Sequence, residues 1–281
     1  MLVLCVTWGF QQVASKVALN QGLPPLFTAL ARSLIAAPLV ITWLGMRRGW
    51  AGLAGLMAPD GTVRAGSLTA VLFALEFVCL FEGMRLTSVS RAVIVLYTAA
   101  FFTAAGAHFF VRGERLRPVN VMGLLLAFAG VGATIGVRGG SVAGDALVLL
   151  AAAAWGLTTV VVKASPALQA AEPEKVLAYQ LVGSVPILAL TAALGGELHV
   201  PQATTLAWVS LLFQGVVVSF TSYLTWFWLI RRYPAGRLAA FSFFTPLFGV
   251  LAAALFLGEP LTPLLLVGMA CVGAGLRLVN R

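Results

Sequence analysis

Long apolar stretches alternate with short polar or charged segments along the whole chain. Ten of these stretches hold about 20 residues each, the length that a helix needs to cross a hydrocarbon layer about 30 Å thick. Helices are expected there because backbone polar groups within lipid must be satisfied inside their own segment. The predicted spans are residues 2–20, 26–46, 66–85, 89–111, 119–137, 143–164, 174–194, 206–230, 236–257 and 261–279.

Composition agrees with this pattern. Hydrophobic residues make up 60% of the chain and charged residues 10%, against about 25% charged in soluble domains. The longest segment between spans, residues 47–65, is too short for a soluble domain. The sequence therefore predicts an all-α integral membrane protein whose function lies within its helices.

Two sequence phrases each occur twice. The phrase Gly-Glu-x-Leu-x-Pro-x4-Gly covers Gly113–Gly123 and recurs at Gly258–Gly268, and Trp-Gly-x6-Lys begins at Trp8 and again at Trp155. The chain is therefore predicted to be a duplicated unit.

Each copy contains five predicted spans, so the second copy must enter the membrane from the opposite side. We therefore expect ten transmembrane helices arranged as two inverted five-helix repeats, residues 1–138 and 139–281. The repeated glycines and prolines fall where helices should end and begin, which favours structural punctuation over a substrate role. Glycines in spans 5 and 10 are interpreted as helix-packing or homodimer surfaces.

Lys and Arg residues predict the orientation, because short cytoplasmic segments carry an excess of them. With the N-terminus inside, the inner segments hold thirteen and the outer segments three. Both termini are therefore expected in the cytoplasm, with the protein a multi-pass component of the cell's inner (plasma) membrane. The net charge of +9 mostly reflects this topology, so the lipid bilayer is the expected partner and nucleic acid is not.

Glu76 is the most costly residue of the chain, because it lies near the middle of the third span. An ionised side chain at that depth costs about 3 kcal/mol. Two interpretations stay open: Glu76 binds substrate or a proton, or it is a protonated carboxyl group hydrogen-bonded in the core. Glu82 and Arg85 are expected to form a surface pair.

Aromatic and small polar residues gather in corresponding helices of the two copies. Together they predict a pocket with apolar walls and a few hydrogen-bonding groups, suited to a small amphiphilic or zwitterionic solute. The candidate substrate-binding residues are Trp8, Gln12, Glu76, Tyr97, Trp155, Thr159, Tyr223 and Ser242.

The paired Trp-Gly dipeptides, Arg32 in span 2 and the two Gly-Glu-x-Leu-x-Pro phrases resemble the drug/metabolite transporter superfamily, in its ten-helix branch with two EamA-type repeats. Within that branch the chain is most similar to the YddG-like amino-acid exporters. The resemblance implies a central cavity between the halves, lined by spans 1, 3, 4, 6, 8 and 9, with spans 5 and 10 at the periphery.

The predicted function is secondary transport by alternating access, which moves small neutral or aromatic amino acids or related metabolites outward. Energy coupling stays open between proton exchange at Glu76 and facilitated flux. No cofactor, nucleotide or metal is implied. A sugar-phosphate, nucleotide-sugar or drug carrier is the nearest alternative, although only Arg32 is basic and deep enough for an anion, and it is interpreted as a packing or cavity-edge residue. An intramembrane lipid enzyme is disfavoured, since His108 and His199 are the only histidines.

Overall fold

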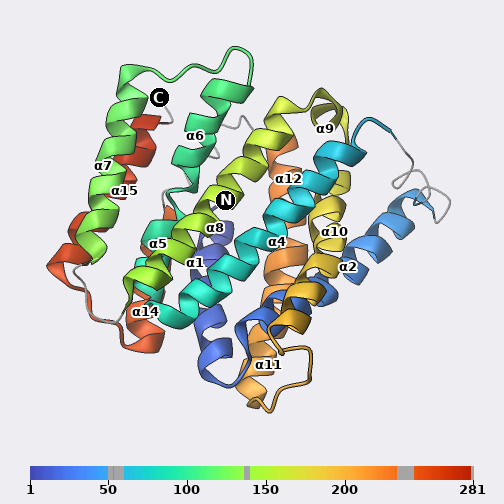
Figure 1. Ribbon diagram of the computed structural model, residues 1–281, viewed down its shortest axis with the longest axis horizontal. Helices are drawn as coiled ribbons and strands as arrows, with labels where there is room; N and C mark the ends of the chain where they lie inside the picture. Colours follow the sequence, from blue (N-terminus) through green and yellow to red (C-terminus); the bar gives the residue numbers. More distant parts are fainter. Residues whose placement is uncertain (50–52, 54–59, 136–139, 233–243, 280–281) are drawn as a thin grey trace.

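The computed structural model describes residues 1–49, 53, 60–135, 140–232 and 244–279, and these residues form helices and connections without a β-strand. The helices pack side by side into a bundle (Figure 1). Their bounds are α1 Leu2–Asn20, α2 Pro25–Arg48, α4 Val63–Leu86, α5 Val89–Leu96, α6 Ala99–Phe110, α7 Pro118–Ile135, α8 Val142–Ala164, α9 Pro166–Ala170, α10 Pro173–Leu194, α11 Thr205–Leu212, the π-helix η1 Phe213–Ser222, α12 Tyr223–Arg232, α14 Phe244–Leu257 and α15 Pro263–Val279.

These helices confirm the predicted membrane character. Seven of the described helical segments are long and apolar enough to cross a membrane. Shorter apolar helices cover Pro118–Ala133, Phe244–Leu257 and Pro263–Leu278, within the remaining three predicted spans. Large apolar side chains also lie on the outside of the bundle; Leu255, for example, is 80% exposed. The chain is a multi-pass helical membrane protein.

Two spans that the sequence pattern predicted as continuous are interrupted. In span 4, α5 ends before Tyr97 and α6 begins after Thr98. The Thr98 hydroxyl donates to the Val95 carbonyl at 2.6 Å, a local bond that competes with the helical ladder. In span 8 the middle section is the π-helix η1, where the Ser219 hydroxyl donates to the carbonyl of Gln214, five residues earlier.

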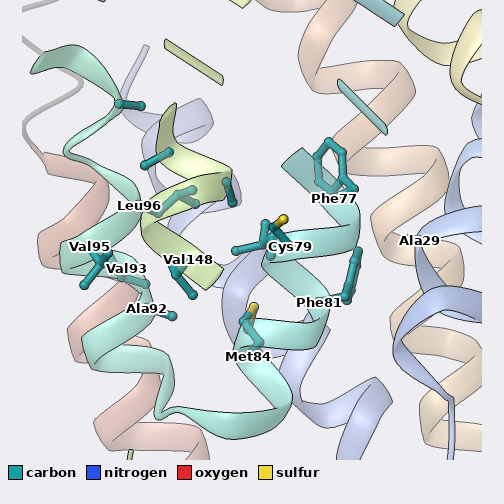
Figure 2. Close-up of a cluster of buried hydrophobic side chains, with 14 of the residues drawn as sticks. Ala29, Phe77, Cys79, Phe81, Met84, Ala92, Val93, Val95, Leu96 and Val148 are labelled. Carbon is teal, nitrogen blue, oxygen red and sulfur yellow. The ribbon is translucent and has the colours of Figure 1, made fainter. Parts of the chain in front are cut away.

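The core of the bundle forms where α4 packs against α8, α10 and α5. Figure 2 shows the buried side chains of α4 and α5 meeting Val148 of α8. Gly83 permits this approach, because a Cβ added there would lie 2.7 Å from the Val148 side chain. Elsewhere in the bundle, α2 packs against α10 and η1, and α1 packs against α11 and α14.

The repeated Gly-Glu phrases lie where one helix ends and the next begins, as predicted. Gly113 follows α6 with φ of 87°, and Gly258 follows α14 with φ of 67°, a left-handed backbone that favours glycine. Pro118 and Pro263 then begin α7 and α15.

Helices α7 and α15 pack along each other at one edge of the bundle (Figure 1). A Cβ added to Gly130 would lie 2.7 Å from the Gly268 oxygen, and one added to Gly275 would lie 2.5 Å from the Gly123 oxygen. These glycines therefore serve packing within one chain. A homodimer through spans 5 and 10 stays a prediction.

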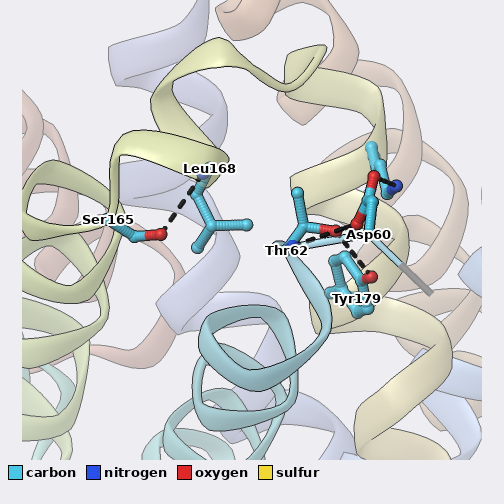
Figure 3. Close-up of polar contacts among 6 residues, drawn as sticks. Asp60, Thr62, Ser165, Leu168 and Tyr179 are labelled. Atoms are coloured by element: carbon cyan, nitrogen blue, oxygen red, sulfur yellow. Dashed lines mark hydrogen bonds and ion pairs between the residues drawn. The ribbon is translucent and has the colours of Figure 1, made fainter.

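Polar contacts join the residues just before α4 to the first turns of α10 (Figure 3). Lys175 Nζ lies 2.5 Å from an Asp60 oxygen, and the hydroxyls of Thr62 and Tyr179 are 2.9 Å apart. The hydrogen bond from Lys175, with those from the Thr62 hydroxyl and N–H, lowers the pKa of Asp60 to about 2.

Candidate functional site

Arg32 of α2 is completely buried in the centre of the bundle. Its guanidinium carbon lies 3.6 Å from the ring centre of Phe77 on α4, and its Nη2 donates to the Tyr223 hydroxyl at 3.3 Å. The Nε and Nη1 atoms have no hydrogen-bond partner among the described residues. A guanidinium keeps its charge in proteins, so Arg32 places unused charged donors in a dry environment.

Glu76 of α4 interacts electrostatically with this guanidinium. It is 7% exposed, so it faces protein rather than lipid, as expected for a carboxylate at that depth. Electrostatic interactions connect Glu76 with Arg32 and with Tyr223. The three side chains come from α4, α2 and α12, and therefore from both predicted repeats.

Trp8 of α1 is anchored next to Tyr223. Its Nε1 donates to the Ser222 hydroxyl at 2.8 Å, at the last residue of η1. Its ring also meets Trp226 edge-to-face, with the ring centres 5.6 Å apart. The π-helix thus ends where α1 and the start of α12 come together, and π-helical turns are frequent at functional sites.

Further polar groups are buried between α1 and η1. The Ser15 hydroxyl donates to Gln214 Oε1 at 2.9 Å, but Gln214 Nε2 has no partner within the described part of the chain. Gln12 is 5% exposed, and its Oε1 is likewise unpartnered among the residues described. Unsatisfied buried polar atoms are rare in folded proteins, so their gathering here marks a region that water or a polar solute would satisfy.

Tyr97 and Trp155 form a second aromatic contact. Tyr97 lies at the break between α5 and α6, and its ring centre is 6.0 Å from that of Trp155 on α8, edge-to-face. Tyr97 also interacts electrostatically with Tyr223. The Thr159 hydroxyl instead donates to the Trp155 carbonyl of its own helix. Ser242 lies outside the described residues.

Several of the predicted residues interact in one series. Electrostatic interactions relate Glu76 to Tyr223 and Tyr223 to Tyr97, Tyr97 contacts Trp155 edge-to-face, and Trp8 bonds to Ser222, which precedes Tyr223 in the chain. Among the described contacts, Thr159 reaches that series through the backbone carbonyl of Trp155 and not through a side chain.

The sequence indicated Arg32 as a packing or cavity-edge residue, and Ser222 and Gln214 were not among the predicted substrate-binding residues. The insertion cost that singled out Glu76 applies equally to an arginine in span 2, so Arg32 carried the same signal.

One Lys–Glu ion pair and one longer-range Lys–Glu electrostatic interaction lie at opposite ends of the bundle, where Figure 1 shows the α6–α7 and α14–α15 connections. Lys163 of α8 forms an ion pair with Glu114, between α6 and α7, at 2.8 Å. Lys16 of α1 interacts electrostatically with Glu259, between α14 and α15, and its Nζ donates to the Thr87 carbonyl at 2.9 Å. Glu259 accepts from two backbone N–H groups at the start of α5, at 2.7 and 2.9 Å.

Comparison with known proteins identifies relatives over the whole chain. The model of the EamA-like transporter family matches residues 1–136 and 142–281. A protein of Salmonella typhimurium (strain LT2) named "Probable amino-acid metabolite efflux pump" is 31% identical over 290 residues, covering 98% of this chain and 91% of that protein. A protein of the same name from Escherichia coli (strain K12) is 30% identical with the same coverage.

A solved crystal structure also matches, with a TM-score of 0.67 over 99% of this chain and 94% of the other. The two sequences are 22% identical, so this likeness shows the fold alone.

Proposed function

The chain belongs to the EamA-like transporter family, and on this basis we propose that it exports small neutral or aromatic amino acids, or related metabolites, by alternating access. Family membership makes it a transporter rather than an enzyme. The proposed cargo is supported by two relatives, about 30% identical, that are named as amino-acid metabolite efflux pumps.

The proposed architecture is ten transmembrane helices in two inverted repeats, residues 1–138 and 139–281. Helix packing supports it. α1 packs on α14 and α11, and its counterpart α8 packs on α6 and α4. α2 packs on η1, and its counterpart α10 packs on α4. α7 and α15 pack on each other, as do α2 and α10. Exchanging the two halves reproduces these pairings, as a pseudo-twofold axis in the membrane plane requires.

The observation that carries the alternating-access mechanism is the exchange of Lys–Glu partners between the halves. Lys16 of the first half interacts electrostatically with Glu259 of the second, beyond ion-pair distance, and Lys163 of the second half forms an ion pair with Glu114 of the first. Because these contacts lie at opposite ends of the bundle, one can hold the outer end closed while the other holds the inner end. From the Lys and Arg distribution, the Lys163–Glu114 end is proposed to be cytoplasmic.

This mechanism can be tested by cross-linking. In a variant without the three native cysteines, Lys163→Cys with Glu114→Cys is joined by a short bifunctional thiol reagent. We expect the cross-link to stop amino-acid counterflow in proteoliposomes and reductant to restore it when the linker is cleavable. The matched control is Glu82→Cys with Arg85→Cys, an ion pair at 3.0 Å within α4, whose cross-link should leave flux unchanged. Full flux through the cross-linked Lys163/Glu114 variant would refute rocking of the halves.

The cargo is tested separately with the wild-type protein. A counterflow panel of radiolabelled amino acids, sugar phosphates and cationic drugs should give exchange with neutral or aromatic amino acids. Exchange confined to sugar phosphates or to cationic drugs would replace the proposed cargo and leave the mechanism standing.

A further inference from the structure

We propose that Arg32 and Glu76 form a zwitterion-recognition pair, in which Arg32 binds the carboxylate of the transported amino acid and Glu76 binds its ammonium group. This inference rests on the proposed function and specifies the charge pattern of its substrate. It also changes the role of Arg32 from a packing or cavity-edge residue to a substrate-binding residue.

The hydrogen-bonding state of the two side chains supports the assignment. Arg32 is 0% exposed, yet only its Nη2 is engaged, by the Tyr223 hydroxyl. Its Nε and Nη1 are unpartnered among the described residues. Arg32 and Glu76 attract each other but form no ion pair within 4.0 Å, and no described hydrogen bond engages the Glu76 carboxylate. Neither side chain is therefore neutralised by an ion pair with the other.

The surroundings of Arg32 hold its guanidinium in place. It stacks on Phe77 at 3.6 Å and lies 5.9 Å from the ring centre of Phe73. Both rings belong to α4, the helix that carries Glu76. Cation–π stacking and the bond to Tyr223 restrict the plane of the guanidinium, so its remaining donors are fixed relative to Glu76 before a ligand arrives.

Charge balance narrows the class of ligand. With Glu76 ionised, the guanidinium and the carboxylate sum to zero, and an amino-acid zwitterion adds zero, so the occupied site stays neutral. A phosphate ester would leave net negative charge among buried apolar side chains, and a cationic drug would leave net positive charge. Burying uncompensated charge is unfavourable, so the pair favours zwitterions over both.

Wild-type protein gives the first test, with probes that share one skeleton. Exchange of labelled L-phenylalanine in proteoliposomes is challenged with L-phenylalanine, with 2-phenylethylamine, which lacks the carboxylate, and with 3-phenylpropanoate, which lacks the ammonium. Each analogue loses a hydrogen bond to a charged group, so both should inhibit about 10- to 100-fold more weakly than L-phenylalanine.

Variants give the second test. Arg32→Gln should bring the inhibition constants of L-phenylalanine and 2-phenylethylamine together, because the carboxylate loses its partner. Glu76→Gln should do the same for L-phenylalanine and 3-phenylpropanoate. Arg85→Gln, which alters an exposed arginine of α4, should leave both ratios unchanged. These ratios do not depend on the amount of folded protein in the vesicles.

The recognition pair and the proposed export function can fail separately. Equal inhibition of the wild-type protein by the three probes, or unchanged ratios in the two site variants, would overturn the recognition pair while amino-acid export stands. If the wild-type protein exchanges no amino acid at all, the proposed function falls and the recognition pair falls with it.

Discussion

Replacing Asp145 by Asn should destabilise the protein strongly, because Asp145 compensates a buried arginine. Asp145 lies in the first turn of α8, where it forms an ion pair with Arg91 of α5 and accepts a hydrogen bond from the Thr87 hydroxyl at 2.7 Å. The two paired side chains are 2% and 7% exposed. The substitution preserves the shape of residue 145 but removes its charge and turns one of its two acceptor oxygens into an NH2 donor, so the Arg91 guanidinium stays buried beside a neutral amide.

The burial of this pair sets the size of the effect. Removing one partner of a buried pair costs about 3–5 kcal/mol. The Lys163–Glu114 pair provides the contrast, since its side chains are 43% and 45% exposed. Water resolvates both partners there, and an exposed pair contributes only about 0.2–1 kcal/mol. Asp145→Asn should therefore cost several times more free energy of unfolding than Glu114→Gln.

Chemical unfolding in detergent micelles, followed by tryptophan fluorescence, measures both variants against the wild-type protein. The double variant Arg91→Met/Asp145→Leu serves as a control, because replacing a buried pair by apolar residues of similar volume is often neutral or stabilising. It should recover most of the stability lost in Asp145→Asn. A loss below about 1 kcal/mol for Asp145→Asn, equal to that of Glu114→Gln, would contradict the argument from burial.

Three further predictions concern coupling, packing and acidity. If Glu76 exchanges a proton in each cycle, Glu76→Gln should abolish the pH dependence of amino-acid flux in proteoliposomes; an unchanged profile would remove Glu76 from coupling. Gly156→Ala places a Cβ 2.7 Å from a backbone oxygen of α6, so thermal unfolding should show a loss of about 1–3 kcal/mol, whereas Gly132→Ala, with nothing within 4 Å of its Cβ, should change little. Asp60 beside Lys175 has its pKa lowered to about 2, so ionised Asp60 stabilises the folded state at pH values above its unfolded pKa near 4. This stabilisation is lost as pH falls through 2. The melting temperatures of wild type and Asp60→Asn should therefore differ at pH 5 and converge between pH 4 and pH 2, and a constant difference would disprove the contribution.

The positions of the helices could be predicted from the sequence because lipid imposes a length on every span. α1 covers the predicted residues 2–20, and α10 begins one residue before its predicted start. The Gly258 and Pro263 boundaries were predictable for a separate reason, since a left-handed turn favours glycine and a first helical turn tolerates proline.

The internal breaks could not be predicted by the same rules. Apolar periodicity measures which faces are buried, and it does not register a hydroxyl that bonds to a nearby carbonyl. The Thr98 bond that accompanies the break between α5 and α6 and the i-to-i−5 bond of Ser219 in η1 are both of this local kind.

The site was partly predictable because a charged residue in the middle of an apolar span is costly wherever it occurs, so its position in the sequence already marks it. That cost identified Glu76 correctly as a side chain facing protein. It could not identify what Glu76 faces, since α2, α4 and α12 are far apart in sequence and meet only through packing. Arg32 and Tyr223 become partners through that packing, which no single helix encodes.

The two ion pairs of α8 indicate where the proposed cycle bends the chain. At one end of α8, Asp145 holds α5 through a buried pair, and at the other end Lys163 holds the exit of α6 through an exposed pair. The buried pair is too costly to break in every cycle, whereas the exposed pair can open at a cost of about 0.2–1 kcal/mol. α5 should therefore stay on α8 while α6 moves away from it. The helical ladder is already interrupted between them, at Tyr97 and Thr98, and Tyr97 lies against Trp155. A hinge at this position would couple the opening of the Lys163–Glu114 end directly to the aromatic wall of the candidate site.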